Sequence, residues 1–361
     1  MTTMARFSGE RLERVKASAQ FRDGAFRNAS SVRPVMKGNT LAITREFFFG
    51  GKRRVPHAPL PVESPLETWS RPSASNLRIT WLGHSTMLLE SGNVRLLTDP
   101  VFGNRVSPVS FAGPKRFHPV PATIAQLPKL DAVLVSHDHL DHLCAPSIRE
   151  LAQLGVPFVT SLGVGLHLER LGVDPDLITE LDWWEEHALP GGILSFTAVP
   201  AQHFSGRGLT DRNATLWSSW VIQTDHHKLF FSGDTGFHDG FADIHAKFGR
   251  FDVTMLEIGA WHRAWGDIHL GPENALRAFQ MLGGGTMLPV HWGTFDLGLH
   301  PWDEPAETLL ALAEPAGARV LTPILGRPFE PAHVDGPNPW WRAVRAASAS
   351  EPELAAAVPS R

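Results

Sequence analysis

Short apolar runs separated by polar turns dominate the chain from Leu77 onward, and this pattern predicts layered strands and helices. Runs that are apolar throughout are typical of strands covered on both faces. Strands are expected at 77–82, 87–90, 94–98, 131–136, 157–160, 193–199, 217–223, 228–232, 253–258, 287–291 and 320–323. Helices are expected at 146–154, 166–171, 241–248, 272–282 and 304–313. Several strands precede the first helix, which indicates sheets covered by helices and not a doubly wound nucleotide fold.

The two ends of the chain lack this pattern. Residues 1–76 show no sustained periodicity and are rich in proline toward their end, so we expect an N-terminal arm packed on the main domain. The main domain is expected at 77–330, and the Pro- and Ala-rich stretch 331–361 as a peripheral C-terminal tail. Phe47–Phe49 stands beside basic residues, which leaves a peripheral membrane contact as the alternative to packing on the domain.

Composition and charge exclude several classes of protein. Among 361 residues, 33 Lys and Arg against 37 Asp and Glu give a net charge of −4, so no nucleic-acid partner is expected. The sequence has neither an apolar secretory signal nor a run of 18 apolar residues that would predict a transmembrane helix. The lone cysteine, Cys144, excludes an intramolecular disulfide and favours a reducing, cytoplasmic location. We expect Cys144 to be a small core residue.

A cluster of metal-ligating residues follows the expected strand at 131–136. The segment reads His137, Asp138, His139, Leu140, Asp141, His142. Residues two apart leave a strand on the same side, so His137 and His139 can bind one cation together. A turn into a helix would then direct Asp141 and His142 toward a second cation. Imidazole and carboxylate groups are suitable ligands for zinc, iron and manganese, and the alternative is a solvated histidine-rich turn.

Three further candidates share one context, the polar end of an apolar strand. They are His203, Asp234 and His291. Each alone also fits a partly buried histidine or an ordinary turn, but their shared placement indicates that they complete the site begun by the first cluster. The seven side chains then divide into three nitrogens for one cation, and two nitrogens and a carboxylate for the other. Asp234 is expected to bridge both.

These motifs resemble the metallo-β-lactamase fold superfamily, and within it the branch of N-acyl-phosphatidylethanolamine-hydrolysing phospholipase D. The resemblance runs from about Leu77 to Trp302 and includes WLGHST, LLTDPVF, GPKRF, SGRGLTDRNATLW, SGDTGF, GDIHLGPENA and VHWGTF. It implies an α/β fold, an αβ/βα sandwich of two packed mixed β-sheets flanked by helices. The site would lie at one edge of the paired sheets.

The resemblance also implies how the ligands are shared between two divalent metal ions. One ion would be held by His137, His139 and His203, and the other by Asp141, His142 and His291, with Asp234 bridging. Zn²⁺ is expected first, with Mn²⁺ and Fe²⁺ as alternatives. Asp99 matches the family aspartate that orients the ligand loop, whereas the residues alone equally fit an Asp-Pro turn.

Other matched positions bear on the substrate. Leu140 stands where the branch carries a tyrosine, and Trp261 also replaces a family tyrosine, so specificity for phosphatidylethanolamine does not carry over. His269 matches a histidine near the metals, expected to bind substrate or steady developing charge, with a structural role as the alternative. Lys115 and Arg116 can hold a phosphate, although a solvent-facing pair is the more common arrangement.

We therefore expect a dinuclear metal-dependent hydrolase, a phosphodiesterase of the phospholipase D type. A metal-bridging hydroxide would attack phosphorus, with Asp141 and Asp234 fixing it and shuttling its proton. A lactonase or ester hydrolase on the same metals is the first alternative, and a non-catalytic metal-binding protein is the second. The expected partner is a small-molecule or lipid-like phosphodiester, with a homodimer and a peripheral membrane contact left open.

Overall fold

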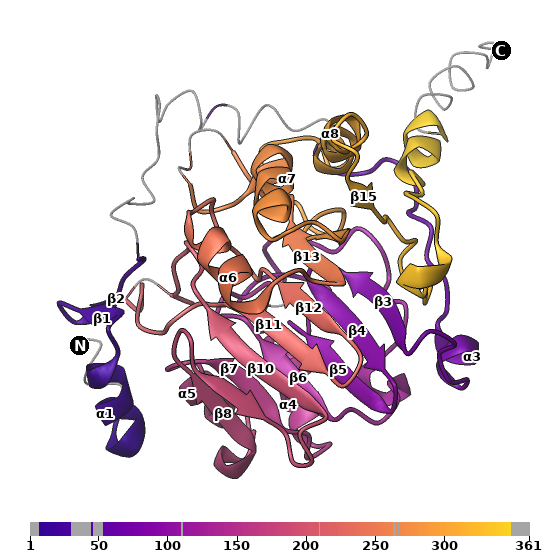
Figure 1. Cartoon of the computed structure of the whole chain (residues 1–361). Helices are drawn as coiled ribbons and strands as arrows, with labels where there is room; N and C mark the ends of the chain where they lie inside the picture. Colours follow the sequence, from indigo (N-terminus) through magenta and orange to yellow (C-terminus); the bar gives the residue numbers. More distant parts are fainter. Residues whose placement is uncertain are drawn as a thin grey trace.

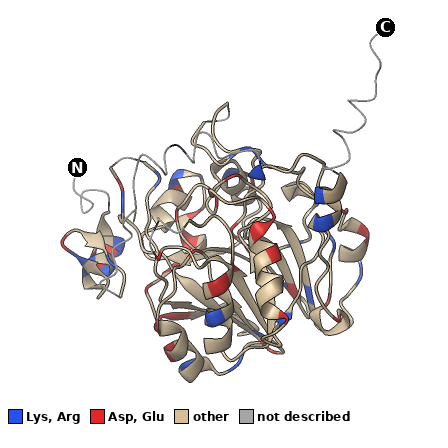
Figure 2. Cartoon of the chain, turned by 90° about the horizontal axis from the view of Figure 1, so that it is seen from above, with Lys and Arg blue, Asp and Glu red and all other residues tan. Residues whose placement is uncertain are grey.

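The computed structural model describes residues 7–29, 45, 53–109, 111–208, 210–262, 265 and 267–347. The expectation for Phe47–Phe49 lies outside the described residues. Within these ranges, no helix has the length and apolar character needed to cross a bilayer. Basic and acidic residues are interspersed along the described chain in Figure 2.

Two mixed β-sheets pack face to face, and helices cover both outer faces (Figure 1). Within the described residues the first sheet has the order β3-β4-β5-β6-β7-β8, with bounds Leu77–Gly83, Thr86–Ser91, Val94–Thr98, Ala132–Val135, Phe158–Ser161 and Ile178–Leu181. The second has the order β15-β14-β13-β12-β11-β10-β9. From β9 to β15 its bounds are Glu186–Ala188, Leu194–Val199, Ser219–Thr224, Lys228–Phe231, Val253–Glu257, Thr286–Val290 and Arg319–Val320.

Parallel pairing in one half of each sheet determines where the site forms. Strands β5 to β8 are parallel in the first sheet, and β12 to β15 are parallel in the second. The carboxyl ends of parallel strands lie at the same edge of a sheet, where ligands are commonly bound in α/β folds. The loops that follow β5, β6, β12 and β14 carry Asp99, the His137–His142 segment, Asp234 and His291.

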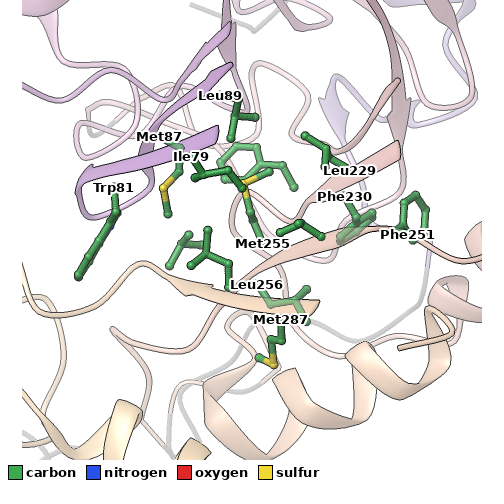
Figure 3. Close-up of a cluster of buried hydrophobic side chains, with 14 of the residues drawn as sticks. Ile79, Trp81, Met87, Leu89, Leu229, Phe230, Phe251, Met255, Leu256 and Met287 are labelled. Carbon is green, nitrogen blue, oxygen red and sulfur yellow. The ribbon is translucent and has the colours of Figure 1, made fainter. Parts of the chain in front are cut away.

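The core between the sheets follows the alternation of strand side chains. In β4, Leu89 points into the inter-sheet core, while its neighbour Leu88 packs on the outer face of the first sheet. In β6, Leu134 points into the inter-sheet core, and Val133 packs on the outer face of the first sheet. Figure 3 shows part of this core, where Ile79, Met87 and Leu89 of the first sheet lie toward Leu229 and Met255 of the second. Both faces of the strands are apolar because both are covered.

Helices α4 to α8 follow the expected amphipathic segments, whereas α1 and α3 lie where no helix was expected. Their bounds are Gly9–Ala17 (α1), Leu66–Trp69 (α3), Ala145–Ala152 (α4), Gly165–Arg170 (α5), Gly240–Phe248 (α6), Gly271–Met281 (α7) and Glu304–Ala313 (α8), with 3₁₀ turns at Ile124–Gln126 (η3), Pro175–Leu177 (η4) and Pro331–His333 (η5). Helices α4 and α5 cover the first sheet, and α6, α7 and α8 cover the second (Figure 1). The expected layered α/β sandwich is confirmed.

The N-terminal segment forms elements that no periodicity predicted. Helix α1 precedes a hairpin of β1 (Phe21–Arg22) and β2 (Ala25–Phe26). Val15 and Phe26 are fully buried in a small cluster with Trp183 and Trp217 of the main body. The helix escaped detection because Val15 is its one buried residue, so its sequence carries almost no apolar stripe.

The segment after 331 differs from the expected peripheral tail. Trp340 and Trp341 are buried in the main core, where Trp340 stacks on Trp292 with ring centroids 5.6 Å apart. Trp292 in turn stacks on Trp81 of β3 at 5.3 Å. Two large aromatic rings therefore anchor a stretch whose proline- and alanine-rich composition indicated a surface position.

Candidate metal centre

The HDHLDH segment leaves β6 as a tight turn that directs its side chains inward. The backbone N–H groups of His142 and Leu143 donate to the carbonyl of His139, at 3.1 and 2.8 Å. Helix α4 begins only at Ala145, so a turn and not a helix reorients Asp141 and His142. The expected ligands of this segment are thus brought together by a tight turn alone, whereas we predicted a turn into a helix.

The first group of ligand atoms joins four of the expected residues. His137 Nε2 and His139 Nδ1 lie 2.9 Å apart, and His139 Nδ1 lies 3.2 Å from His203 Nε2. Asp234 Oδ2 is 3.8 Å from His137 Nε2 and 3.6 Å from His203 Nε2. His203 is oriented by its other ring nitrogen, which is 2.8 Å from the carbonyl oxygen of Ile268.

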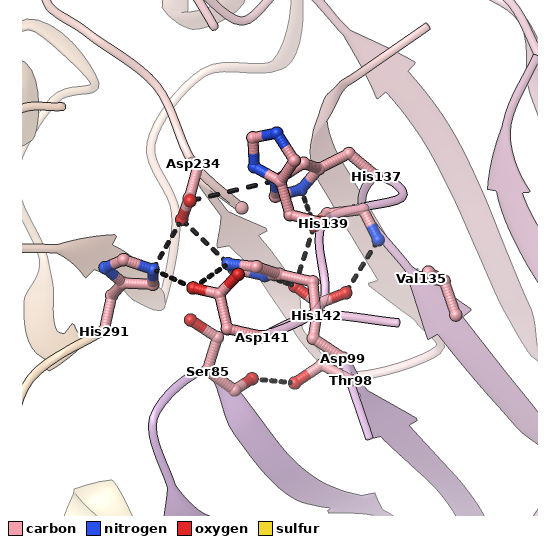
Figure 4. A network of polar contacts seen from close by, with 12 residues as sticks. Ser85, Thr98, Asp99, Val135, His137, His139, Asp141, His142, Asp234 and His291 are labelled. Atoms are coloured by element: carbon pink, nitrogen blue, oxygen red, sulfur yellow. Dashed lines mark hydrogen bonds and ion pairs between the residues drawn. The ribbon is translucent and has the colours of Figure 1, made fainter. Parts of the chain in front are cut away.

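The second group joins the remaining expected ligands, as Figure 4 shows. His142 Nε2 and His291 Nε2 lie 3.1 and 3.2 Å from Asp234 Oδ1. Asp141 Oδ2 lies 3.2 Å from His291 Nε2 and 3.6 Å from His142 Nε2. The two oxygens of Asp234 thus face different groups, the arrangement expected of a bridging carboxylate.

A close approach of two loops allows Asp234 to reach both groups. Gly233 has a left-handed φ of 52°, and a Cβ atom at this position would lie 2.7 Å from Ser136 Cβ. Only glycine satisfies both conditions, so the Asp234 loop can pack directly on the residue that precedes His137.

The spacing of these atoms fits divalent cations. In a tetrahedral zinc site, ligand atoms about 2.0–2.1 Å from the metal lie roughly 3.3–3.4 Å from one another. The separations of 2.9–3.8 Å in the two groups bracket that value. His142 Nε2 and Asp234 Oδ1 are buried and, although 3.1 Å apart, form no well-aligned hydrogen bond, which is costly unless a cation satisfies them.

The electrostatics of the first group favours neutral imidazoles, the form that binds metal. Burial lowers the pKa of His137 and His203 well below the usual value, and neighbouring histidines lower it further. In the second group burial also opposes charge on His142, but Asp234, Asp141 and Asp99 outweigh it and raise the pKa of His142. Surplus negative charge is thus concentrated beside His142, where a cation would neutralise it.

Asp99 braces the HDHLDH segment from behind. Its Oδ1 accepts the backbone N–H of Ser136 at 2.7 Å, and its Oδ2 accepts the Ser136 hydroxyl at 2.7 Å and lies 2.6 Å from His142 Nδ1. Asp99 is completely buried. The geometry corresponds to the orienting aspartate that the resemblance implied, because it fixes which ring nitrogen of His142 faces the ligand cluster.

Glu257, which the sequence analysis missed, occupies the equivalent place in the second sheet. Its Oε1 accepts the backbone N–H groups of Thr235 at 2.7 Å and Leu270 at 3.3 Å, and its Oε2 lies 2.6 Å from His269 Nδ1. A third group of potential ligand atoms combines Glu257 and His269 with Asp234 and His291, which the second group also uses. The only sequence signal was an acidic residue at the end of an apolar strand.

His84 is a second residue at the site that the sequence pattern did not indicate. Its Nε2 lies 3.0 Å from Asp141 Oδ2, and its ring packs on His291 with centroids 4.0 Å apart. Burial and the neighbouring His291 lower the pKa of His84 to about 3. Its φ of 53° is strained for a residue with a side chain, as often occurs at functional sites. The signal was a histidine at the end of β3.

Two residues from distant segments hold the ligand loops. The guanidinium of Arg207 donates to the carbonyl oxygens of Asp138 and Leu143, at 2.5 and 2.9 Å, and so closes the HDHLDH turn. Asn28, in the N-terminal segment, donates to the carbonyl of His203 at 2.9 Å and accepts its N–H at 3.0 Å. The N-terminal segment therefore supports one of the candidate ligands directly.

Arg116 corrects one expectation. It is neither solvent-facing nor free to hold a phosphate, since it is buried and donates to the carbonyls of Val101 and Gly103. Burial lowers its pKa to about 10, and its guanidinium lies 4.8 Å from the centre of the Phe295 ring. The expectation for Cys144 is confirmed, because it is buried beside Phe295 and makes no disulfide.

A pocket of about 380 Å³ opens beside the two groups of ligand atoms. Its polar lining comprises His139, Asp141, His203, Asp234, His269 and Arg212. Its apolar lining comprises Phe204, Ala260, Trp265, Ile268 and Leu297. Leu140, the residue in place of the family tyrosine, packs with Leu297 in a small apolar cluster.

Comparisons with known proteins agree with this architecture. The family model described as the beta-lactamase superfamily domain matches residues 94–292. An uncharacterized protein of Mycobacterium tuberculosis is 44% identical over 331 residues, covering 90% of this chain and 88% of its own. The N-acyl-phosphatidylethanolamine-hydrolyzing phospholipase D 1 of Caenorhabditis elegans is 36% identical over 273 residues, covering 72% and 77%.

The fold has a counterpart among solved structures. Igni18, a metallo hydrolase from the archaeon Ignicoccus hospitalis, superposes with a TM-score of 0.53 at 22% identity, covering 70% of this chain and 98% of that one. Together, these matches and the His- and Asp-rich site identify a metal-dependent hydrolase. The chain belongs to the metallo-β-lactamase superfamily and resembles its N-acyl-phosphatidylethanolamine-hydrolysing phospholipase D branch.

Proposed function

We propose that the protein is a dinuclear metal-dependent phosphodiesterase. The observation that carries the proposal is Asp234, whose Oδ2 faces the first group of ligands and whose Oδ1 faces the second. One cation would be held by His137, His139, His203 and Asp234, and the other by Asp141, His142, His291 and Asp234. The nitrogen-rich donor set favours Zn²⁺, with Mn²⁺ and Fe²⁺ as alternatives.

Particular side chains of this pocket would act on the nucleophile and on the substrate. Two divalent cations at such a site supply a water nucleophile at neutral pH and polarise the phosphoryl oxygen. Asp141 and Asp234 would orient that nucleophile, and one of the two carboxylates would take up the proton that the water loses, since both line the pocket beside the imidazoles. His269 lines the same pocket and meets the substrate through Nε2, because its Nδ1 is engaged by Glu257.

An arginine at the pocket supports an anionic substrate. Among the described residues that line the pocket, Arg212 carries the one cationic side chain apart from the histidines. Its guanidinium lies 4.5 Å from the centre of the Phe204 ring, and that ring packs on His139 at 4.6 Å. Arg212 is exposed, so it can move toward a ligand. A phosphodiester carries the negative charge that such a cation attracts, whereas a lactone or a carboxylic ester does not.

The apolar wall of the pocket supports a lipid-like or other apolar substituent on the diester. Phe204, Ile268 and Leu297 face the same space as the candidate ligands. The Caenorhabditis relative carries a phospholipid-hydrolysing activity in its name, which supports the same substrate class. The buried, unpaired Cys144 supports a reducing location such as the cytoplasm.

A substrate panel tests the proposal. Purified protein, stripped of metal and reloaded with Zn²⁺ or Mn²⁺, is assayed with bis(p-nitrophenyl) phosphate, p-nitrophenyl butyrate and an N-acyl homoserine lactone. We expect metal-dependent hydrolysis of the diester, with kcat/KM at least tenfold above that for the ester and the lactone. Preferred turnover of the lactone or the ester would establish the alternative hydrolase. Bound metal without any turnover would support a non-catalytic metal-binding protein.

A further inference from the structure

Glu257 is a buried carboxylate to which the proposed ligand set gives no role. It is the last residue of β13 and is completely buried beneath the pocket. Its hydrogen bonds join the Asp234 loop, through the N–H of Thr235, to the loop that carries His269. Burying a carboxylate is costly unless each oxygen is well partnered, so this arrangement demands an explanation.

The two oxygens of Glu257 have separate partners. Oε1 receives two backbone N–H groups, from Thr235 and Leu270, and therefore must be an acceptor. Oε2 is left to accept the Nδ1–H of His269 at 2.6 Å. That bond places the ring proton on Nδ1 and directs Nε2 into the pocket that His269 lines. The distance from Oε2 to His291 Nδ1 is 3.7 Å, too long for a hydrogen bond.

We propose that Glu257 is the positioning residue of His269. It fixes the orientation and the tautomer of the imidazole, so that Nε2 is held toward the substrate oxygen. The inference rests on the proposed role of His269 at the substrate. A carboxylate behind a histidine acts in this way in hydrolytic triads, where amide replacement keeps the geometry but selects the wrong tautomer.

The structure predicts what glutamine at this position would do. In E257Q the amide oxygen must take the two backbone N–H groups, because an NH₂ group cannot accept them. The NH₂ group then faces His269 and donates to Nδ1, which forces the neutral ring to carry its proton on Nε2. The substitution therefore exchanges the tautomer of His269 with little change in side-chain volume.

Nitrogen NMR of ¹⁵N-histidine-labelled protein reads this exchange without any substrate. The spectrum of H269Q identifies the His269 signals by their loss. We expect the Nδ1–H tautomer in the native protein and the Nε2–H tautomer in E257Q. E90Q is the matched control, because Glu90 is another buried carboxylate but pairs with Arg78 in the first sheet. It should leave the His269 signals unchanged. An unchanged tautomer in E257Q would overturn the proposal.

Kinetics separate a positioning role from a purely structural one. With the best diester of the panel, we expect E257Q to lower kcat by about 10- to 100-fold, with KM within about threefold and metal content unchanged. In the H269Q background the same change should cost nothing further, since Glu257 would have lost its target. A full additional loss in H269Q/E257Q would show that Glu257 acts elsewhere.

E257D provides a second variant in case E257Q does not fold. Its carboxylate is one methylene shorter, so it can keep Thr235 but not reach His269 with the same bond. We expect the two tautomers of His269 to coexist in E257D and kcat to fall. A single Nδ1–H tautomer with native kcat would contradict the proposal. If no diester is cleaved at all, the proposed function fails, while the NMR result still decides the role of Glu257.

Discussion

The two sheets contribute to the metal centre in different ways. The first sheet supplies four candidate ligands from one continuous segment, 137–142, which a single turn folds around the carbonyl of His139. The second sheet supplies single residues, each on its own loop, and Asp234 and His291 follow different strands. Both halves have a completely buried carboxylate behind them, Asp99 in the first and Glu257 in the second.

This difference separates two tasks. Asp99 holds the backbone and side chain of Ser136 and the ring of His142, so it shapes the ligand segment itself. Glu257 holds His269, which lines the pocket but belongs to neither set of proposed ligands. If the proposed ligand sets hold, the first half would supply four ligands from one segment, whereas the second half would add His203 and His291 singly and present a bridging carboxylate and a substrate-facing imidazole.

Removing Asp234 should give the largest effect, because it takes one oxygen from each group of ligands. We expect D234A to lower kcat/KM by at least about 1,000-fold and to reduce bound metal from two ions per chain to fewer than one. Metal analysis and diester kinetics measure this. D138N is the control. Asp138 is buried in the same segment, but it accepts the backbone N–H of Gly206 and belongs to neither set of proposed ligands. Equal losses in both variants would show that the segment is merely sensitive to disruption.

Replacing Asp99 should weaken metal binding more than chemistry. D99N changes the partner of His142 Nδ1, so we expect metal affinity to fall by about 10- to 100-fold, as measured by competition with a chelating dye. At saturating metal, kcat should recover most of its native value. E257Q should show the opposite pattern, with native metal affinity and low kcat. If D99N and E257Q changed metal affinity and kcat in the same way, Asp99 and Glu257 would not have the different roles described above.

Arg212 tests the substrate side of the second half. We expect R212Q to raise KM for the diester by about tenfold, because a charge-assisted hydrogen bond to an anion contributes about 1.5–3 kcal/mol and exposure reduces it. The effect should shrink in high salt, and KM for a neutral ester should stay within twofold. R105Q is a matched surface control, since Arg105 lies in an exposed loop bonded to Gly113. An equal rise in KM for the ester would argue against anion recognition.

Asn28 should give the smallest effect. N28A removes two hydrogen bonds to the backbone of His203, each of which contributes about 0.5–1.5 kcal/mol. Because they hold the backbone and not the imidazole, we expect only part of this free energy to act on metal binding, and metal affinity to fall by about threefold. N213A is a comparison variant, because Asn213 bonds to Ser205, two residues beyond His203. A loss as large as that of D99N would show that the N-terminal segment organises the centre as strongly as Asp99 does.

The sequence predicted most of the strands and the seven residues of the proposed ligand sets, but not His84 or Glu257, and the difference has a physical reason. Residues 137–142 are contiguous, so they can be recognised as metal ligands without knowledge of the fold. His291 and Asp234 stand where apolar strands end, which marks them as candidates for the same site. Strands β8 and β9 were missed because they are short and, in β9, half exposed. Their alternation is too brief to distinguish from loop.

The residues that surround and support the proposed ligands were harder to predict. Glu257 reads as one residue of an apolar strand, and its role appears only when the loop carrying His269 folds back onto the end of β13. His84 depends on a left-handed turn that places its ring on His291. Arg116 was misjudged because a charged pair in a loop predicts exposure, whereas this side chain is buried and two of its nitrogens donate to backbone carbonyls. Such roles depend on tertiary contacts between segments distant in sequence.

The stacked indoles behind His291 give the protein a built-in optical signal. Trp292 adjoins His291 in the chain and stacks on both Trp81 and Trp340, whose rings also contact each other. Because the chain contains no tyrosine, its near-ultraviolet emission arises from tryptophan alone. Titration of the native chain with a cation should therefore change its fluorescence without any attached dye, and W292F would identify the ring that responds.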